Sequence, residues 1–246
     1  MIIRGIIFDI NGTLIDIHTD EGSEDIYRAI SHFLSYQGIY LHRWEVRDKY
    51  YEIIDNQRQA SAEEYFEFDA VEVWREFMKL NATNSTLLTP EKLKQIPLFL
   101  AEIYRGMSRH RLQLYPDVKA VLEGLHHRFR LAALSDAQSA WALPEMQAVG
   151  IESFFDPIII SSEYGFRKPD RRLFEAALYK LEIEPENVLF VGNDMYRDIF
   201  GARQLGIKTV FFSSNQGRQH MNGVNPDYII YRFAELKQAI RFFESQ

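Results

Sequence analysis

The sequence contains no cysteine among its 246 residues. This absence excludes disulfide bonds, thiolate metal sites and thiol nucleophiles. No apolar run approaches the ~20 residues that a transmembrane helix requires. The apolar first segment, residues 1–10, is too short to span a membrane and has no small-residue cleavage site. We therefore expect a soluble, cytoplasmic protein without a membrane partner.

The sequence has fewer basic than acidic residues. The 28 lysines and arginines are outnumbered by 35 aspartates and glutamates, which gives a net charge of −7. Because nucleic acids and anionic membranes repel an acidic surface, neither is expected as the main partner. The glycine-rich dinucleotide motif, the P-loop and zinc motifs are absent as well, so neither a nucleotide cofactor nor zinc is implied.

Strand-like and helix-like segments alternate along most of the chain. Apolar, β-branched runs predict buried strands at residues 2–8, 131–134, 157–160, 187–191 and 208–212. Amphipathic stretches predict helices at residues 117–128, 138–149, 170–181 and 197–205. This alternation predicts an α/β fold whose core is a Rossmann-like, doubly wound parallel sheet.

The segment from about residue 16 to residue 112 differs from the rest of the chain. It shows no convincing strand, and its apolar residues recur at helical spacing, for example over residues 26–34 and 66–77. Ser61 and Thr89 stand at predicted helix starts. We therefore expect an all-helical insert at residues 17–111, with the core formed by residues 1–16 and 112–246.

Groups able to perform phosphoryl chemistry recur where predicted strands end or helices begin. They are Asp9, Ser135 with Asp136, Lys168, and Asp194 with Asp198. Open α/β sheets bind ligands at the carboxyl ends of their strands. A phosphoryl-transfer site requires a nucleophile, donors to the phosphate oxygens and carboxylates for Mg²⁺. Each piece alone is weak evidence, but four in order predict such a site.

On these four motifs, which cover residues 2–16 and 112–215, the chain resembles the haloacid dehalogenase superfamily. Most members are phosphatases with a Rossmann-like core, and many carry a helical cap between the first and second motifs. The resemblance implies that Asp9 is the nucleophile and forms an aspartyl-phosphate. It implies that Ser135 donates a hydrogen bond to a phosphoryl oxygen and that Lys168 offsets negative charge.

The same resemblance implies a metal site and further substrate contacts. Mg²⁺ would be held by the Asp9 carboxylate and the Asn11 backbone carbonyl, together with carboxylates from the fourth motif. Those carboxylates are Asp194 and Asp198. The substrate would be contacted by five residues: Asn11, Gly12, Ser135, Asp136 and Lys168.

Two positions depart from the family pattern. Members usually carry a second aspartate two residues after the nucleophile, but this chain has Asn11 there. A carboxamide does not transfer protons near neutral pH, and losing general acid–base catalysis typically costs ~10²–10⁴ in rate. An aspartate also often follows Gly192, where this chain has Asn193. Which of Asn193, Asp194 and Asp198 would hold the metal is left open.

Asn11 leaves several functions open. A working hydrolase would act on substrates with good leaving groups, such as acyl or aryl phosphates, or would use another base such as Asp136. A slow enzyme or a regulatory protein would bind phosphate esters without useful turnover. A 2-haloacid dehalogenase would attack carbon without Mg²⁺ and would also lack the second acid. The sequence does not distinguish a natural Asn11 from an engineered or a deamidated one.

We expect above all a Mg²⁺-dependent hydrolase of a small phosphomonoester, closed by the helical cap. Aromatic residues of the insert, among them Tyr50, Tyr51, Phe68 and Trp74, are interpreted mainly as core packing. Arg58 is interpreted as part of a solvated helix face. The sequence fixes neither the substrate nor the oligomeric state.

Overall fold

A parallel sheet forms one end of the molecule. The computed structural model describes residues 1–86 and 89–246; residues 87 and 88, in the expected helical insert, lie outside the described residues. In the described part of the chain the main sheet has six strands in the order β5-β4-β1-β6-β7-β8, all parallel to their neighbours. They are β1 (Gly5–Phe8), β4 (Arg130–Ser135), β5 (Ile158–Ile160), β6 (Val188–Gly192), β7 (Lys208–Phe212) and β8 (Tyr228–Ile230).

The predicted Rossmann-like sheet is confirmed, with one strand more than expected. Strand β8 was missed because it has three residues, of which only Ile230 is buried. Such a short stretch gives no periodic signal.

Helices cover both faces of the sheet. They are α5 (Val118–Leu125), α6 (Ser139–Ala148), α7 (Arg171–Leu181), α8 (Gly201–Arg203) and α9 (Leu236–Glu244), together with the π-helix η4 (Met195–Phe200). Short 3₁₀ turns lie at η1 (Glu152–Phe154), η2 (Ser161–Glu163), η3 (Pro185–Asn187) and η5 (Phe233–Glu235). The helix expected at 197–205 is thus a π-helix followed by one short α-helical turn.

Strand β1 shows how the sheet builds two cores. Successive side chains of a strand point to opposite faces. Ile6 and Phe8 join the apolar cluster that includes α5 and α9, whereas Ile7 joins the cluster on the other face with α7 and α8. All three side chains are fully buried. This burial on both faces explains why the strand is apolar throughout.

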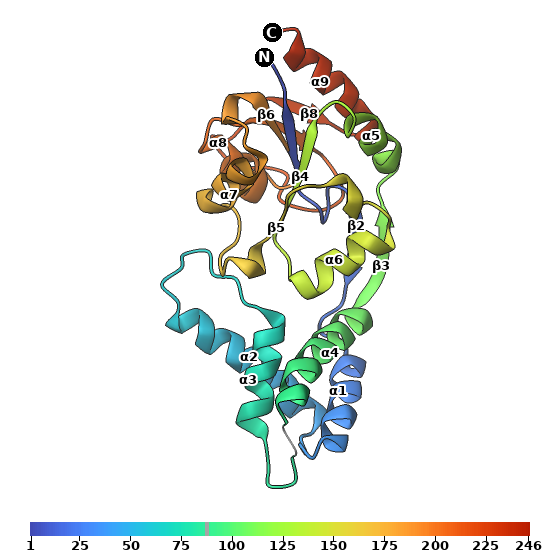
Figure 1. Ribbon diagram of the computed structural model, residues 1–246, viewed down its shortest axis with the longest axis vertical. Helices are drawn as coiled ribbons and strands as arrows, with labels where there is room; N and C mark the ends of the chain where they lie inside the picture. Colours follow the sequence, from blue (N-terminus) through green and yellow to red (C-terminus); the bar gives the residue numbers. More distant parts are fainter. Residues whose placement is uncertain (87–88) are drawn as a thin grey trace.

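The insert forms a helical lobe at the other end of the molecule, away from both termini (Figure 1). Its helices are α1 (Glu24–Tyr36), α2 (Arg43–Ala60), α3 (Ala70–Asn81) and α4 (Pro90–Ser108). Buried aromatic residues hold them together, and Trp74 stacks on Tyr50 with ring centres 4.5 Å apart. No helix among residues 1–86 and 89–246 has both the length and the apolar character that crossing a membrane requires.

The two predicted helix starts in the insert have different outcomes. The Thr89 hydroxyl accepts a hydrogen bond from the Lys92 N–H at 3.3 Å and caps α4, as predicted. Ser61 instead follows the end of α2, and the next helix begins after Asp69, whose carboxylate caps α3. The Ser61 prediction is wrong because part of residues 61–69 pairs with the loop before α7, as described below.

A two-stranded ribbon connects the lobes. Strands β2 (Ile15–Thr19) and β3 (Arg109–Leu114) pair antiparallel at the two ends of the insert. The expectation that residues 16–112 hold no strand is therefore wrong at both ends. Charged and polar residues interrupt both strands, Asp16 and His18 in β2 and Arg111 and Gln113 in β3, so neither has the continuous apolar run of a core strand. Asp16 fastens the ribbon, since its carboxylate accepts from Arg111 at 2.8 Å and from Gln113 at 3.2 Å.

The aromatic core of the helical lobe generates a stability prediction. Trp74→Ala is expected to lower the free energy of unfolding by ~3–5 kcal/mol, because it leaves a large cavity in a buried cluster. Urea denaturation followed by circular dichroism measures the change. Tyr36→Ala, which removes an aromatic ring that is 84% exposed, serves as the control and should change the free energy by less than ~0.5 kcal/mol. Equal effects of the two variants would contradict the packing described here.

Candidate active site

The carboxyl ends of three neighbouring strands hold the predicted site residues. Strands β4, β1 and β6 are adjacent and parallel, so their carboxyl ends lie along one edge of the sheet. Asp9 follows β1 directly, Ser135 ends β4, and Gly192 ends β6. Lys168 reaches the same place from the loop before α7. The structure thus brings together residues from distant parts of the sequence.

The Lys168 ammonium lies between two carboxylates. Its Nζ is 2.7 Å from Asp9 Oδ1 and 2.6 Å from Asp198 Oδ1, and it donates a longer bond to the Leu134 carbonyl at 3.3 Å. All three charged side chains are buried. Burial alone would lower the pKa of Lys168, but Asp198, Asp9 and Asp136 together raise it above its usual range. The lysine is therefore charged throughout the physiological pH range.

The carboxyl of Asp198 is shifted in the opposite sense to an ordinary salt-bridged aspartate. Burial raises the pKa of Asp198 to about 6, although Lys168 favours its charged form. Its second oxygen accepts hydrogen bonds from the backbone N–H groups of Asn193 and Asp194, both at 3.0 Å. Asp198 thereby ties Lys168 to the end of β6.

Thr13, which the sequence analysis missed, holds the other oxygen of the nucleophile candidate. The Thr13 hydroxyl lies 2.8 Å from Asp9 Oδ2 and 3.1 Å from Asn193 Oδ1. Gly12, with φ of +87°, allows this close turn, because a Cβ there would lie 2.3 Å from the Asn193 amide nitrogen. The available signal was a hydroxyl four residues after Asp9, in the same motif.

Ser135 and Asp136 present unpartnered oxygens in a buried place. The Ser135 hydroxyl is 1% exposed and has no hydrogen-bond partner among the described residues. Asp136 accepts the Lys168 backbone N–H at 2.9 Å through Oδ1, whereas Oδ2 is buried and without a hydrogen bond in that part of the chain. Burial raises the pKa of the Asp136 carboxyl. Since buried polar atoms are normally satisfied, these oxygens are available to a bound ligand.

The predicted Mg²⁺ ligands do not form a metal cage in this arrangement. Asp194 Oδ1 accepts from the backbone N–H groups of Tyr196 and Arg197 at 2.9 and 2.8 Å, and Oδ2 accepts from the Arg218 N–H at 3.0 Å and Arg197 Nε at 3.1 Å. Asp194 therefore caps η4, and Asp198 accepts from Lys168 and two backbone N–H groups. Within residues 1–86 and 89–246 no three His, Asp or Glu side chains converge as metal ligands. The residues present do not fit the expected ion.

The helical lobe contacts the sheet next to Lys168. Phe66 forms a β-bridge with Phe166, with backbone hydrogen bonds from Glu67 to Gly165 at 3.0 Å and from Arg167 to Tyr65 at 2.8 Å. The buried Glu67 carboxylate also accepts from Ser161 Oγ and from Arg167, both at 2.8 Å. Burial raises the pKa of Glu67, an effect that Arg167 and Ser161 oppose. This contact holds the lobe over the carboxyl edge of the sheet.

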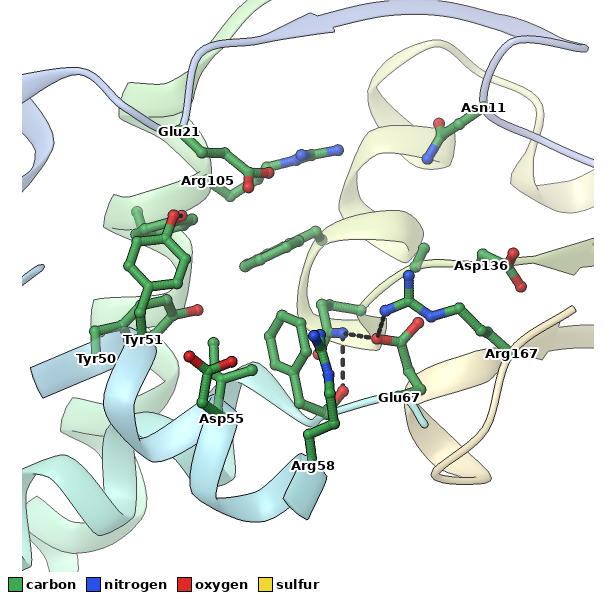
Figure 2. Close-up of a pocket in the computed structure, with 16 residues that line it drawn as sticks. Asn11, Glu21, Tyr50, Tyr51, Asp55, Arg58, Glu67, Arg105, Asp136 and Arg167 are labelled. Carbon is green, nitrogen blue, oxygen red and sulfur yellow. Dashed lines mark hydrogen bonds and ion pairs between the residues drawn. The ribbon is translucent and has the colours of Figure 1, made fainter. Parts of the chain in front are cut away.

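A cavity of about 470 Å³ lies between the helical lobe and the sheet. Asn11 and Asp136 line it on the side of the sheet, and Figure 2 shows both across the cavity from the helical lobe's Tyr51 and Asp55. Several residues interpreted from the sequence as core or surface line it as well: Tyr50, Tyr51, Arg58 and Phe68. For Tyr50, periodicity gave no distinction, because a buried residue that lines a cavity and one that packs a core lie on the same helix face.

The buried charges generate a prediction about Lys168. Lys168→Met keeps the length of the side chain but leaves Asp9 and Asp198 buried together without a counter-charge. The free energy of unfolding is expected to fall by ~3–5 kcal/mol, as when one partner of a buried ion pair is removed. Chemical denaturation measures this, with the exposed Lys180→Met on α7 as the matched control. A loss of less than ~1 kcal/mol for Lys168→Met would contradict the buried triad.

Comparisons with curated proteins find phosphatases that match part of the chain. A glyceraldehyde 3-phosphate phosphatase of Methanothermobacter thermautotrophicus is 30% identical over 135 residues, which is 54% of this chain and 59% of that protein. A phosphoserine phosphatase of Thermus thermophilus is 32% identical over 123 residues, 50% of this chain and 47% of that protein. The chain thus spans about half the length of the curated relatives it matches.

Solved structures match over nearly the whole chain and show the same fold. A 2-haloacid dehalogenase from Pseudomonas syringae pv. Tomato is 18% identical, with a TM-score of 0.74 covering 98% of this chain and 100% of that one. A HAD phosphatase from Thermococcus onnurineus is 21% identical, with a TM-score of 0.58 covering 97% and 98%. The sequence pattern of one family matches residues 3–206, most of the chain. The protein therefore belongs to the haloacid dehalogenase-like hydrolases.

Proposed function

We propose that this hydrolase cleaves a small phosphomonoester through an aspartyl-phosphate at Asp9. The observation that carries the proposal is the Ser135 hydroxyl, which is buried and unpartnered at the same sheet edge as Asp9 and Lys168. A phosphoryl oxygen would accept that hydrogen bond. The partial relatives with phosphatase names support the reaction class.

The proposed reaction has two steps. A carboxylate oxygen of Asp9 bonds to phosphorus, the bond from phosphorus to the ester oxygen breaks, and the leaving oxygen takes the electron pair. Water then attacks the phosphorus of the aspartyl-phosphate, releasing phosphate and restoring the carboxylate. Lys168 stays charged and offsets the negative charge gathered around Asp9, and Thr13 orients the Asp9 carboxylate.

Asn11 limits the substrates that the first step accepts. With no acid at this position, the leaving oxygen departs without a proton from the usual partner. Acyl and aryl phosphates, whose leaving groups are stable as anions, are therefore the favoured substrates. Asp136 is an alternative proton donor in the site, because burial raises the pKa of its carboxyl and one of its oxygens has no hydrogen bond among the described residues.

Mg²⁺ dependence, expected from the resemblance, is not carried into the proposed steps. The carboxylates of Asp194 and Asp198 are occupied by cations and N–H groups, as described above. Arg197 supplies a positive charge beside them, with Nη2 at 3.1 Å from Asp194 and Nη1 at 3.9 Å from Asp136. Lys168 and Arg197 are the chain's own cations at this edge of the sheet.

The two lobes have different roles in the proposed reaction. Residues 17–111 act as a cap that covers the catalytic core of residues 1–16 and 112–246 and excludes water from Asp9. The partner is a small phosphate ester rather than a nucleic acid or a membrane, in keeping with the net charge of −7. A cytoplasmic location remains part of the proposal.

The first test of the proposal is turnover. Wild type should release phosphate from acetyl phosphate and p-nitrophenyl phosphate, and Asp9→Asn should abolish the release because it removes the nucleophile. Asn11→Asp should raise kcat for simple alkyl phosphates by ~10²–10⁴, since it supplies the missing acid. A phosphate assay on the three purified proteins, with peptide mapping of residue 11, measures this. If wild type is inactive and only Asn11→Asp turns over, the chain is a binding or regulatory protein instead.

One observation favours a second function. Asn11 removes the acid, and the carboxylates of the fourth motif are engaged elsewhere, which are features of a site that uses an aspartate without a metal. In 2-haloacid dehalogenation Asp9 would attack carbon and displace a halide. That reaction would leave an ester of Asp9 for water to cleave.

Metal chelation distinguishes the expected metal dependence from the arrangement described here. Because the chain's own cations lie at the site, the rate of phosphate release by wild type should fall less than ~2-fold in excess EDTA. A required metal would stabilise the transition state by several kcal/mol, so its removal would lower the rate far more. Chloride release from 2-chloropropionate in parallel tests the second function. Complete loss of phosphate release in EDTA, with recovery on adding Mg²⁺, would show that the fourth motif rearranges to bind the ion.

A further inference from the structure

The part of the cavity that is remote from the nucleophile carries unpaired negative charge. Glu21 and Asp55 both line the cavity, and in Figure 2 they lie on the opposite side from Asn11 and Asp136. Both residues are exposed, and among residues 1–86 and 89–246 neither carboxylate has an ion-pair partner within 4.0 Å. Whatever occupies this part of the cavity faces two free carboxylates.

Tyrosines complete the same wall. Tyr50, Tyr51 and Tyr104 line it, and their rings or hydroxyls are in contact: the Tyr51 and Tyr104 hydroxyl oxygens are 3.1 Å apart, and the Tyr50 and Tyr104 ring centres are 5.1 Å apart. The Tyr50 hydroxyl is buried and has no hydrogen-bond partner in the described chain. It is therefore a polar atom that is left for a ligand to satisfy.

The Glu21 carboxylate acts on these tyrosines. Burial is the main cause that raises the pKa of Tyr50 and of Tyr104, and Glu21 adds to the rise at both hydroxyls. The negative field of Glu21 therefore reaches the aromatic wall. Aromatic faces and carboxylates attract the same kind of group, a cation.

The cavity's arginines mostly do not cancel this charge. Arg105 forms a double hydrogen bond with Glu145, at 2.7 and 3.1 Å, and its guanidinium lies over the Trp141 ring. Arg167 is paired with Glu67 at 2.8 Å. Arg58 is the remaining cavity-lining arginine without an ion pair among the described residues, so it offsets at most one of the two free carboxylates.

We infer that the substrate's leaving group carries a cationic nitrogen, which binds at Glu21 and Asp55 against the tyrosine wall. The inference rests on the proposed phosphate-ester chemistry and names its substrate class: an amino or quaternary ammonium phosphomonoester. The phosphate lies at Asp9, Ser135 and Lys168, and the cation extends into the cavity. A second anionic group on the leaving portion would be repelled by the same carboxylates.

Two matched pairs of esters test the inference. Phosphocholine is compared with 3,3-dimethylbutyl phosphate, in which carbon replaces the charged nitrogen, and phosphoethanolamine is compared with propyl phosphate. Isothermal titration of wild type with each ester should give about 10-fold tighter binding for the cationic member of at least one pair, the size expected for a partly desolvated cation–aromatic contact. Equal or weaker binding of the cationic member in both pairs would overturn the inference.

Charge-neutral variants locate the effect. Glu21→Gln and Asp55→Asn together should reduce the cationic preference to less than 2-fold. Glu52→Gln is the matched control, because Glu52 is a carboxylate of α2 that is exposed like Asp55 but does not line the cavity. A preference that survives in the double variant would also overturn the assignment. The comparison of ester pairs on wild type stands even if the double variant does not fold.

The titration separates this inference from the proposed function. Heat of hydrolysis would add to heat of binding, so phosphorus NMR of each sample afterwards records whether the ester was cleaved, and any pair with a cleaved member is titrated again with Asp9→Asn. Tighter binding of the cationic esters without cleavage of any ester would retain the inference and reject the hydrolysis. Cleavage of p-nitrophenyl phosphate through Asp9 with no cationic preference would do the reverse.

Discussion

The site depends on one buried positive charge. Lys168 contacts Asp9, Asp198 and the Leu134 carbonyl. A single ammonium therefore connects the end of β4, the residue after β1 and the helix η4 that follows β6. Removing ions from water costs several kcal/mol each, and only good geometry with additional hydrogen bonds repays it. Here those bonds come from Thr13 to Asp9 and from two backbone N–H groups to Asp198. The arrangement of the strand ends is therefore an electrostatic requirement as much as a packing one.

Two carboxamides change the charge balance around that lysine. Compared with the family pattern, in which an aspartate is usual at the position of Asn11 and common at that of Asn193, the two carboxamides remove two negative charges from the sheet edge. That is the same amount of charge that a divalent cation would neutralise. Together with Arg197, which pairs with Asp194, the substitutions leave four carboxylates at this edge, all of them beside Lys168 or Arg197, the chain's own cations. The loss of the acid and the engagement of the metal-ligand candidates are in this sense one electrostatic change.

Much of the fold was predictable because the buried strands are apolar on both faces and their motifs occur at strand ends. Ser135 and Asp9 were found this way, and Lys168 was found before a predicted helix start. The ribbon of β2 and β3 was not, since charged residues such as Arg111 alternate along it and only pairing with its partner strand stabilises it. The engagement of Asp194 was equally hidden: a carboxylate after a strand suits both a helix cap and a metal, and only the positions of the Arg197 and Arg218 N–H groups distinguish the two.

The β-bridge between Phe66 and Phe166 places the helical lobe two residues from Lys168 along the chain. Any swing of the lobe that admits a substrate must break this bridge or carry the 165–167 loop with it. In the second case the Lys168 ammonium would shift relative to Asp9. The ion pair between the two would then form only after the lobe has closed. Closure of the lobe over the substrate and formation of the Lys168–Asp9 contact would then be coupled through this loop.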